Sequence, residues 1–207
     1  NYRLVPDVTV NQQLQDVARA LRWIRDHGSQ YPCDMRNIML TGDSAGGQLA
    51  AYSAVLMQSA QLRKTFDTVD PQMELTALLL TSPVAFMRDG GLFSLYTKPM
   101  WGTDYKDKAT YPYMDFDQII DYAQALPPTY LITSSGDTLA NKQTHRLYEV
   151  LQAHGVQAEI KDYAKAEYNQ SLPHVFSVLQ PFEPAGTAAI DKALAFYQQA
   201  MTAKAAQ

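Results

Sequence analysis

Residues 42–46 read Gly-Asp-Ser-Ala-Gly, and this Gly-x-Ser-x-Gly spacing is typical of a serine nucleophile. An apolar run precedes the motif at residues 37–42, and a stretch rich in Ala and Leu follows it. The motif therefore joins a predicted strand to a predicted helix through a sharp turn, in which its two glycines would allow close backbone approach. We predict Ser44 as a nucleophile and the backbone N–H of Ala45 as an oxyanion donor. The alternative is an incidental serine in a glycine-rich turn.

A general base for this serine has to come from the four histidines of the chain. His27 and His154 each precede a glycine at the end of a predicted helix, where a protonated imidazole interacts favourably with the helix dipole. His145 lies on a predicted helix. His174 alone lies in a predicted loop after the last strand, which places it beside Ser44 at the carboxyl ends of the strands. We therefore predict His174 as the base; the alternative is a surface histidine.

An acid that orients the base is predicted at Asp137. This residue follows the apolar run at 129–134 through a Ser-Gly pair, so it lies on a tight turn at the carboxyl end of a strand. A carboxylate there can accept a hydrogen bond from one ring nitrogen of His174 and stabilise the imidazolium. Asp162 is the competing candidate, although it lies near the end of the following strand. Asp43, inside the serine motif, is expected to support the turn.

Strands and helices alternate along the chain, and this order predicts an α/β fold with a mostly parallel sheet and helices on both faces. Apolar runs predict strands at residues 37–42, 75–81, 129–134 and 158–163, and the end of an earlier strand at 2–5. Helices are predicted from Asn11, as N-cap, to His27, and at residues 45–59, 141–154 and 184–201. The last of these carries Ile190, Leu194, Tyr197 and Met201 on one face, and the tail after Met201 is expected to fray.

The segment at about residues 82–128 interrupts this alternation. A connection of this length, with Gly90-Gly91 inside it, is typical of a lid or a binding loop. Its many rings either form a wall for a substrate or pack the insertion's own core, and the sequence favours neither reading. The aromatic residues are Phe86, Phe93, Tyr96, Trp101, Tyr105, Tyr111, Tyr113, Phe116 and Tyr122.

The composition indicates one globular domain over residues 1–207, with 46% hydrophobic and 18% charged residues. A net charge of −4 without a long basic run argues against nucleic acid or an anionic membrane as partner. The sequence has no membrane-length apolar run, and its first residues lack the basic and apolar regions of a signal peptide. Cys33, the single cysteine, excludes an internal disulfide and fits a reducing compartment, so a cytoplasmic protein is expected. Because the chain begins with Asn1 rather than Met, we expect that its natural start is missing.

Four segments follow one another along the chain: Tyr2-Arg3-Leu4-x-Pro6, Gly42-Asp43-Ser44-Ala45-Gly46-Gly47, Gly136-Asp137-x-Leu139 and His174-Val175-Phe176. Together they resemble the hormone-sensitive-lipase-like esterases, and the resemblance covers essentially the whole chain. It implies the α/β-hydrolase fold and a catalytic triad of Ser44, Asp137 and His174. The resemblance further implies hydrolysis of small carboxylic esters through an acyl-enzyme, with no metal or organic cofactor. The resemblance is compatible with a homo-oligomer and does not specify the oligomeric state.

One feature of that family is absent from this sequence. The family carries a His-Gly-Gly-Gly-type loop upstream of the Tyr-Arg-Leu segment, whose N–H groups supply further oxyanion donors, and this chain begins at that segment. We therefore expect an α/β-hydrolase sheet that is incomplete at its N-terminus, in a chain that is part of a longer protein. A remnant completed by a partner and an inactive relative are the alternatives. Two other functions stay open: a serine peptidase or amidase with the same triad, and a non-catalytic relative that binds a ligand.

Overall fold

The computed structural model describes residues 1–88 and 93–206, so Gly90-Gly91 of the predicted insertion lies outside the described residues. The chain forms two compact units. The first, called the helical unit, comprises Asn1–Met35, Ala51–Glu74 and Phe86–Ala125. The second, called the sheet unit, comprises Arg36–Ala50, Leu75–Ala85 and Leu126–Gln207 and carries every predicted site residue. The single domain predicted over residues 1–207 stays a prediction.

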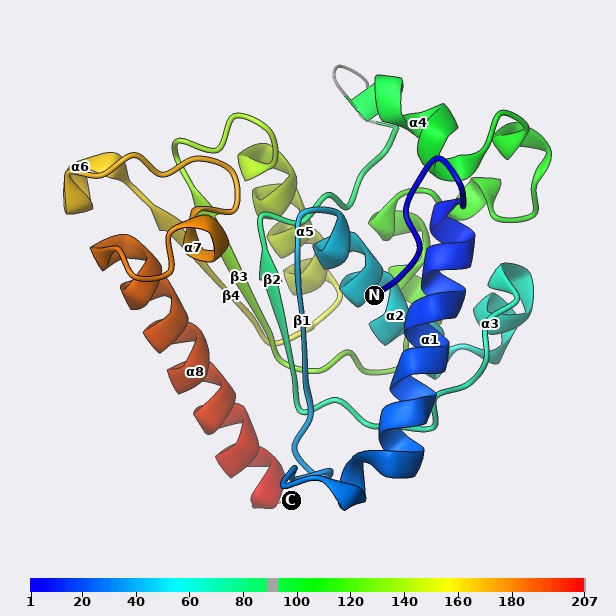
Figure 1. The fold of residues 1–207 in the computed structure, drawn as a ribbon, viewed down its shortest axis with the longest axis horizontal. Helices are drawn as coiled ribbons and strands as arrows, with labels where there is room; N and C mark the ends of the chain where they lie inside the picture. Colours follow the sequence, from blue (N-terminus) through cyan, green and yellow to red (C-terminus); the bar gives the residue numbers. More distant parts are fainter. Residues whose placement is uncertain (89–92, 207) are drawn as a thin grey trace. The chain divides into compact units, whose positions relative to one another are not determined.

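The sheet unit is built on four strands, β1 (Met39–Asp43), β2 (Ala77–Thr81), β3 (Thr129–Ser134) and β4 (Ala158–Tyr163). They pair in the order β1-β2-β3-β4, and every pairing is parallel. The predicted parallel sheet is thus confirmed, and the bounds of β3 and β4 agree with the prediction. Because the strands are parallel, the segments that follow them start at one edge of the sheet (Figure 1).

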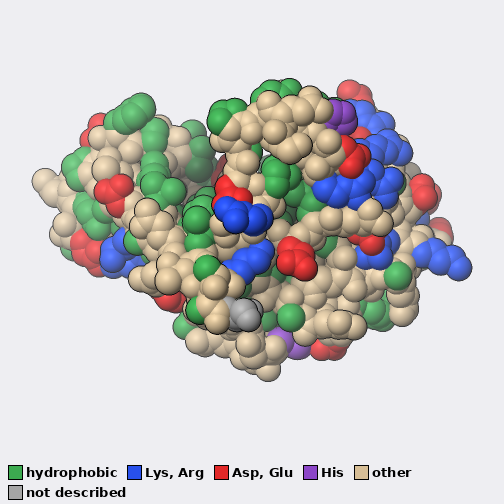
Figure 2. Space-filling model, turned by 90° about the horizontal axis from the view of Figure 1, so that it is seen from below, with side chains coloured by type: hydrophobic (Ala, Val, Ile, Leu, Met, Phe, Trp, Pro, Cys, Tyr) green, Lys and Arg blue, Asp and Glu red, His purple; other side chains and the backbone are tan. Residues whose placement is uncertain are grey.

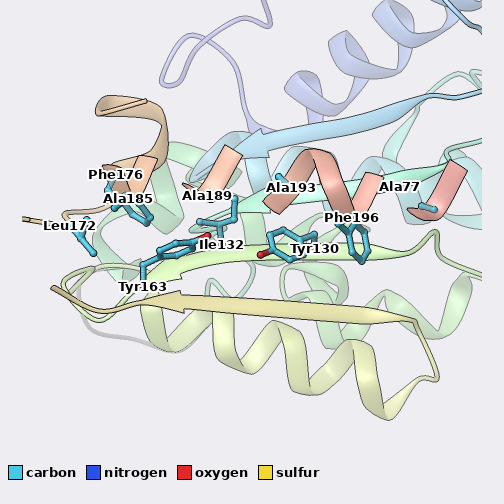
Figure 3. Packing of buried hydrophobic residues seen from close by; sticks show 11 residues of the cluster. Ala77, Tyr130, Ile132, Tyr163, Leu172, Phe176, Ala185, Ala189, Ala193 and Phe196 are labelled. Carbon is cyan, nitrogen blue, oxygen red and sulfur yellow. The ribbon is translucent and has the colours of Figure 1, made fainter. Parts of the chain in front are cut away.

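Helices cover both faces of this sheet, as predicted. Figure 3 shows α8 (Pro184–Ala205) and α7 (Phe176–Leu179) on one side of β3 and β4 and α5 (Asn141–Ala153) on the other. A short α6 (Lys165–Tyr168) follows β4, and α2 (Ala45–Gln58) begins in the sheet unit directly after the serine.

Small residues let α8 lie close to the sheet. Its buried side consists of Ala185, Gly186, Ala189, Ala193, Phe196 and Ala200. Phe196 packs on Tyr130 of β3 with ring centroids 5.2 Å apart. The face predicted from Ile190 and Leu194 is instead partly exposed, at 39% and 47%. The predicted fraying after Met201 was wrong as well, since the helix continues to Ala205.

The helical unit contains α1 (Val10–His27), α3 (Ala60–Phe66) and α4 (Phe93–Trp101). The N-cap of α1 is Thr9 rather than the predicted Asn11, because Thr9 and Gln12 form a capping box. The strand end predicted at residues 2–5 was wrong, since no strand is assigned there. Single 3-10 turns complete the unit at Gly28–Gln30, Tyr105–Asp107, Tyr111–Tyr113, Phe116–Gln118 and Ile120–Tyr122.

Aromatic rings of the predicted insertion pack inside the helical unit. The ring of Tyr52, on α2, lies 6.2–6.4 Å from the rings of Phe66, Trp101 and Phe116. Trp101 and Phe116 are buried to 2% and 1% exposure, as expected for a core. Trp101 and Phe116 thus pack in a core that the insertion shares with α2, and these two rings agree with the packing interpretation rather than with a wall for a substrate. The wall for a substrate stays a prediction.

The surface carries acidic and basic side chains together, and Figure 2 shows both distributed over the face that it draws. Ion pairs account for part of this pattern, among them Arg63–Asp70 at 2.8 Å and Lys108–Asp104 at 2.9 Å. Ion pairs at the surface each contribute about 0–1 kcal/mol to stability. Among the helices of the described residues, none is both long enough and apolar enough to span a membrane.

Candidate active site

Ser44 lies in a strained turn between β1 and α2. Its φ of 51° falls in the left-handed region, which is uncommon for a residue with a side chain. Three backbone hydrogen bonds hold it there. Its N–H donates to the Thr81 carbonyl at 3.0 Å, and its own carbonyl accepts from Val84 and Gln48, both at 3.2 Å. Strain of this kind persists only where the surrounding structure fixes the residue, and such sites cluster at functional positions.

The turn leaves no room for a side chain at Gly42. A Cβ added there would lie 2.2 Å from the Gly46 carbonyl oxygen, so the close approach predicted for Gly42 is confirmed. The same expectation fails for Gly46 itself, since a Cβ there would meet no described atom within 4 Å. Gly47 is the second tight position, where a Cβ would lie 2.9 Å from the Pro83 side chain.

The structure brings the three predicted site residues into one hydrogen-bonded line. The Ser44 Oγ lies 2.8 Å from His174 Nε2, and His174 Nδ1 lies 3.0 Å from Asp137 Oδ2. An ionised carboxylate only accepts hydrogen bonds, so Nδ1 must carry the proton that it shares with Asp137. The lone pair of Nε2 is then free to accept the Ser44 hydroxyl proton. This is the arrangement that a general base needs.

Two backbone N–H groups hold the other oxygen of Asp137. Its Oδ1 accepts from Leu139 N at 3.0 Å and from Ala140 N at 2.9 Å, and the side chain is fully buried. Burial alone would raise the pKa of this carboxyl. Hydrogen bonds from His174 and from the Ala140 N–H outweigh burial, and the pKa of Asp137 lies below its ordinary value. Asp137 is therefore ionised at neutral pH.

Sequence reasoning missed these donors, although a signal for them exists. An aspartate side chain in a turn commonly accepts hydrogen bonds from the backbone N–H groups two or three residues further along the chain. Asp137 is in such a turn just before α5, and its donors Leu139 and Ala140 follow it by two and three residues.

The competing acid, Asp162, belongs to a different cluster. Its Oδ2 accepts from Asn141 Nδ2 at 2.9 Å and lies 2.8 Å from His145 Nε2. This second His–Asp pair links α5 to β4. The structure therefore brings Asp137, and not Asp162, to His174.

The remaining histidines lie at helix ends, as predicted. His27 Nδ1 lies 2.9 Å from the Trp23 carbonyl, and His154 Nδ1 lies 2.7 Å from the Val150 carbonyl. Each ring thus binds a carbonyl near the end of its helix. Asp43 is exposed at the end of β1, and Ala45 is the first residue of α2. The N–H groups of a first helical turn have no intrahelical acceptor, so Ala45 N–H meets the requirement for an oxyanion donor. That role stays a prediction.

Several known proteins that are similar to this chain are named as esterases. The family described as alpha/beta hydrolase fold matches residues 1–170. A Mycobacterium tuberculosis protein named "Probable carboxylic ester hydrolase LipM" is 27% identical over 200 residues, which is 94% of this chain and 45% of that protein. An acetyl esterase of Salmonella choleraesuis is 24% identical over 178 residues, covering 79% of this chain and 51% of the relative.

Solved structures agree with the fold. Esterase B from Lactobacillus rhamnosis superposes with a TM-score of 0.89 at 29% identity, over 99% of this chain and 65% of that one. This chain thus spans less than half of LipM and about two thirds of esterase B. The strand order, the serine turn and the family match over most of the chain agree with one another, and the protein belongs to the α/β-hydrolase fold family.

Proposed function

We propose that this protein is a serine carboxylesterase that hydrolyses small carboxylic esters through an acyl-enzyme on Ser44. The observation that carries the proposal is the line of hydrogen bonds from Ser44 Oγ through His174 to Asp137. A nucleophile, a base and an orienting acid in this order support acyl transfer. The names of the relatives support an ester as the substrate.

The reaction proceeds in two halves. Ser44 Oγ attacks the ester carbonyl carbon while His174 Nε2 takes the hydroxyl proton, and the imidazolium then returns this proton to the departing alcohol. In the second half a water attacks the acyl-enzyme and gives a proton to Nε2, and Ser44 leaves with that proton. Asp137 keeps Nδ1 protonated and stabilises the imidazolium in both halves.

The carbonyl oxygen becomes negatively charged during each attack. Ala45 N–H, beside the serine at the positive end of α2, is the proposed donor to this oxyanion. Removal of one such donor typically lowers turnover by about a hundred- to a thousandfold. Donors beyond Ala45 are needed for full activity.

A short-chain glycerol ester is the first substrate to test. Esterase B from Lactobacillus rhamnosis has been solved in a form inhibited by a tributyrin phosphonate. By this likeness we propose tributyrin and p-nitrophenyl butyrate as substrates of the protein.

The test compares two histidines that each pair with an aspartate. In the full-length protein we expect Ser44→Ala and His174→Ala to lose nearly all hydrolysis of p-nitrophenyl butyrate. His145→Ala removes the other His–Asp pair and is expected to keep it. Undiminished hydrolysis by Ser44→Ala would falsify the proposal. A matched butyryl anilide distinguishes an amidase, since faster cleavage of the anilide than of the ester would reverse the choice of substrate. Binding of the ester without turnover would indicate a non-catalytic relative.

A further inference from the structure

The loop that carries His174 contains a residue with an unfavourable backbone conformation. It lies between α6 and α7, and Val175, the residue after the histidine, has a φ of 50°. A β-branched residue in the left-handed region is a genuine outlier, because its branched side chain crowds the backbone there. Such a conformation relaxes unless neighbouring contacts fix it. An anchor outside the loop is therefore required to keep the imidazole in place.

The end of β3 supplies a contact of this kind. Ser134, the last residue of β3, is fully buried and donates from Oγ to the Leu172 carbonyl at 2.7 Å. Leu172 precedes the histidine by two residues and is itself buried to 3% exposure. Figure 3 shows Leu172 beside Phe176 at this end of the sheet. The hydrogen bond thus fixes the loop on the amino-terminal side of His174.

A second contact joins the same two segments. Gly136 faces the Leu172 carbonyl so closely that an added Cβ would lie 2.5 Å from its oxygen. Gly136 directly precedes the acid, Asp137. The segment from Ser134 to Asp137 therefore touches the base loop at Leu172 and bonds the imidazole at Asp137 Oδ2.

We propose that Ser134 is a positioning residue, which holds the general base at bonding distance from both the acid and the nucleophile. The inference rests on the proposed function, because it gives Ser134 a role in the same reaction. Ser134 acts on the base loop through its hydrogen bond to the Leu172 carbonyl. Asp137, the acid, and Ser134, which anchors the base loop, then belong to one short segment at the end of β3. This segment sets the distance between the carboxylate of Asp137 and the loop that carries His174.

The distances leave little tolerance for movement of the loop. Nε2 and Nδ1 of His174 lie 2.8 and 3.0 Å from their partners, so a shift of about 1 Å exceeds hydrogen-bond range. A misplacement of about 1 Å at a catalytic group corresponds to a loss of roughly a hundredfold in rate. Partial recovery of the position by the remaining contacts lowers this factor, so we expect Ser134→Ala to lose about tenfold to a hundredfold in kcat.

The neighbouring serine provides the matched control. Ser135 is exposed, and its Oγ has only a long contact of 3.5 Å to the Tyr163 carbonyl. We expect Ser135→Ala to keep the kcat, the KM and the pH profile of the wild type. Ser134→Ala is expected to lower kcat with KM unchanged.

The experiment measures butyrate ester hydrolysis per folded molecule, with the folded fraction taken from circular dichroism and denaturant unfolding. A role confined to stability predicts fewer folded molecules but the wild-type kcat and KM for each folded molecule. That result in Ser134→Ala overturns the inference. Ser44→Ala is assayed in the same series: if it is inactive while Ser134→Ala is fully active, only the positioning role fails. An active Ser44→Ala overturns the proposed function instead.

Discussion

Replacement of Asp137 by asparagine removes the charge of the carboxylate but keeps a side chain of the same shape. Oδ1 accepts two backbone N–H groups, from Leu139 and Ala140, whereas Oδ2 faces His174 Nδ1. An asparagine can satisfy both N–H donors only by placing its own oxygen where Oδ1 lies. Its NH2 group then faces the imidazole, and Nδ1 has to accept a hydrogen bond instead of donating one.

The magnitudes favour this orientation. The opposite flip would turn the NH2 toward two N–H donors and leave them unpaired, at a cost of about 2 kcal/mol or more. A difference of that size favours the first orientation by roughly thirtyfold. His174 is then held with its proton on Nε2, which points at Ser44 and cannot take the hydroxyl proton. A wrong tautomer of this kind corresponds to a loss of about ten-thousandfold in kcat.

Asp137→Ala is the matched comparison. Alanine leaves the Leu139 and Ala140 N–H groups without their acceptor, and Ala140 is fully buried. We expect the alanine variant to be less stable than the asparagine variant by about 1–3 kcal/mol in urea unfolding. In p-nitrophenyl butyrate hydrolysis at neutral pH, however, asparagine should be no faster than alanine. An asparagine variant that keeps a tenth of the wild-type kcat, or clearly exceeds the alanine variant, would refute the tautomer argument.

Strain and close packing around the site make further outcomes measurable. Ser44→Gly and Ser44→Ala are both expected to be inactive, but glycine tolerates the φ of 51° and should be more stable in urea by about 0.5–1 kcal/mol; equal stability would contradict strain at this turn. Gly42→Ala is expected to lower the free energy of unfolding by about 2 kcal/mol through contact with the Gly46 carbonyl. Gly46→Ala, with open space at its Cβ, should be neutral or stabilising, and equal losses in the two variants would contradict the packing. Because the folded pKa of Asp137 is lowered, its ionised form stabilises the fold above the ordinary aspartate pKa, and this contribution disappears as pH falls through the lowered value. Unfolding measured below about pH 4 should therefore show a steeper loss of stability in the wild type than in Asp137→Asn.

Strand positions were predictable wherever burial was complete. All six residues of β3 are buried, and its predicted and observed bounds agree. β1 is half exposed and paired on one edge only within the described part of the chain, and its observed bounds, 39–43, differ from the predicted 37–42. β4 also ends the strand order within the described residues and is mostly half-buried, yet its bounds were predicted correctly, so complete burial helps to mark a strand but is not required.

Helix α3 was missed because its signal is local and short. Ser59 accepts a hydrogen bond from Leu62 N as the N-cap, and Leu62 and Phe66, four residues apart, are buried. In the sequence this segment follows α2 directly, so only the first helix was predicted, over residues 45–59, and the second was not recognised. The buried face of α8 was predicted wrongly for another reason. Its alanines allow the helix to approach the sheet closely, whereas the prediction considered only the large apolar residues.

The three site residues could be predicted because a parallel sheet converts sequence position into spatial position. Each follows a strand, and the carboxyl ends of parallel strands meet at one edge, so a correct strand assignment is sufficient to bring them together. The contact from Ser134 to Leu172 has no such basis. It joins residues 38 positions apart and depends on a loop whose Val175 has a φ that few valines adopt. Sequence patterns therefore indicate which groups are candidates for the reaction, whereas the distances between these groups depend on tertiary contacts such as this one. Substitutions at Ser134 of β3 and in the His174 loop test this distinction between the identity of the groups and the distances between them. They alter the distances while Ser44, Asp137 and His174 all remain present.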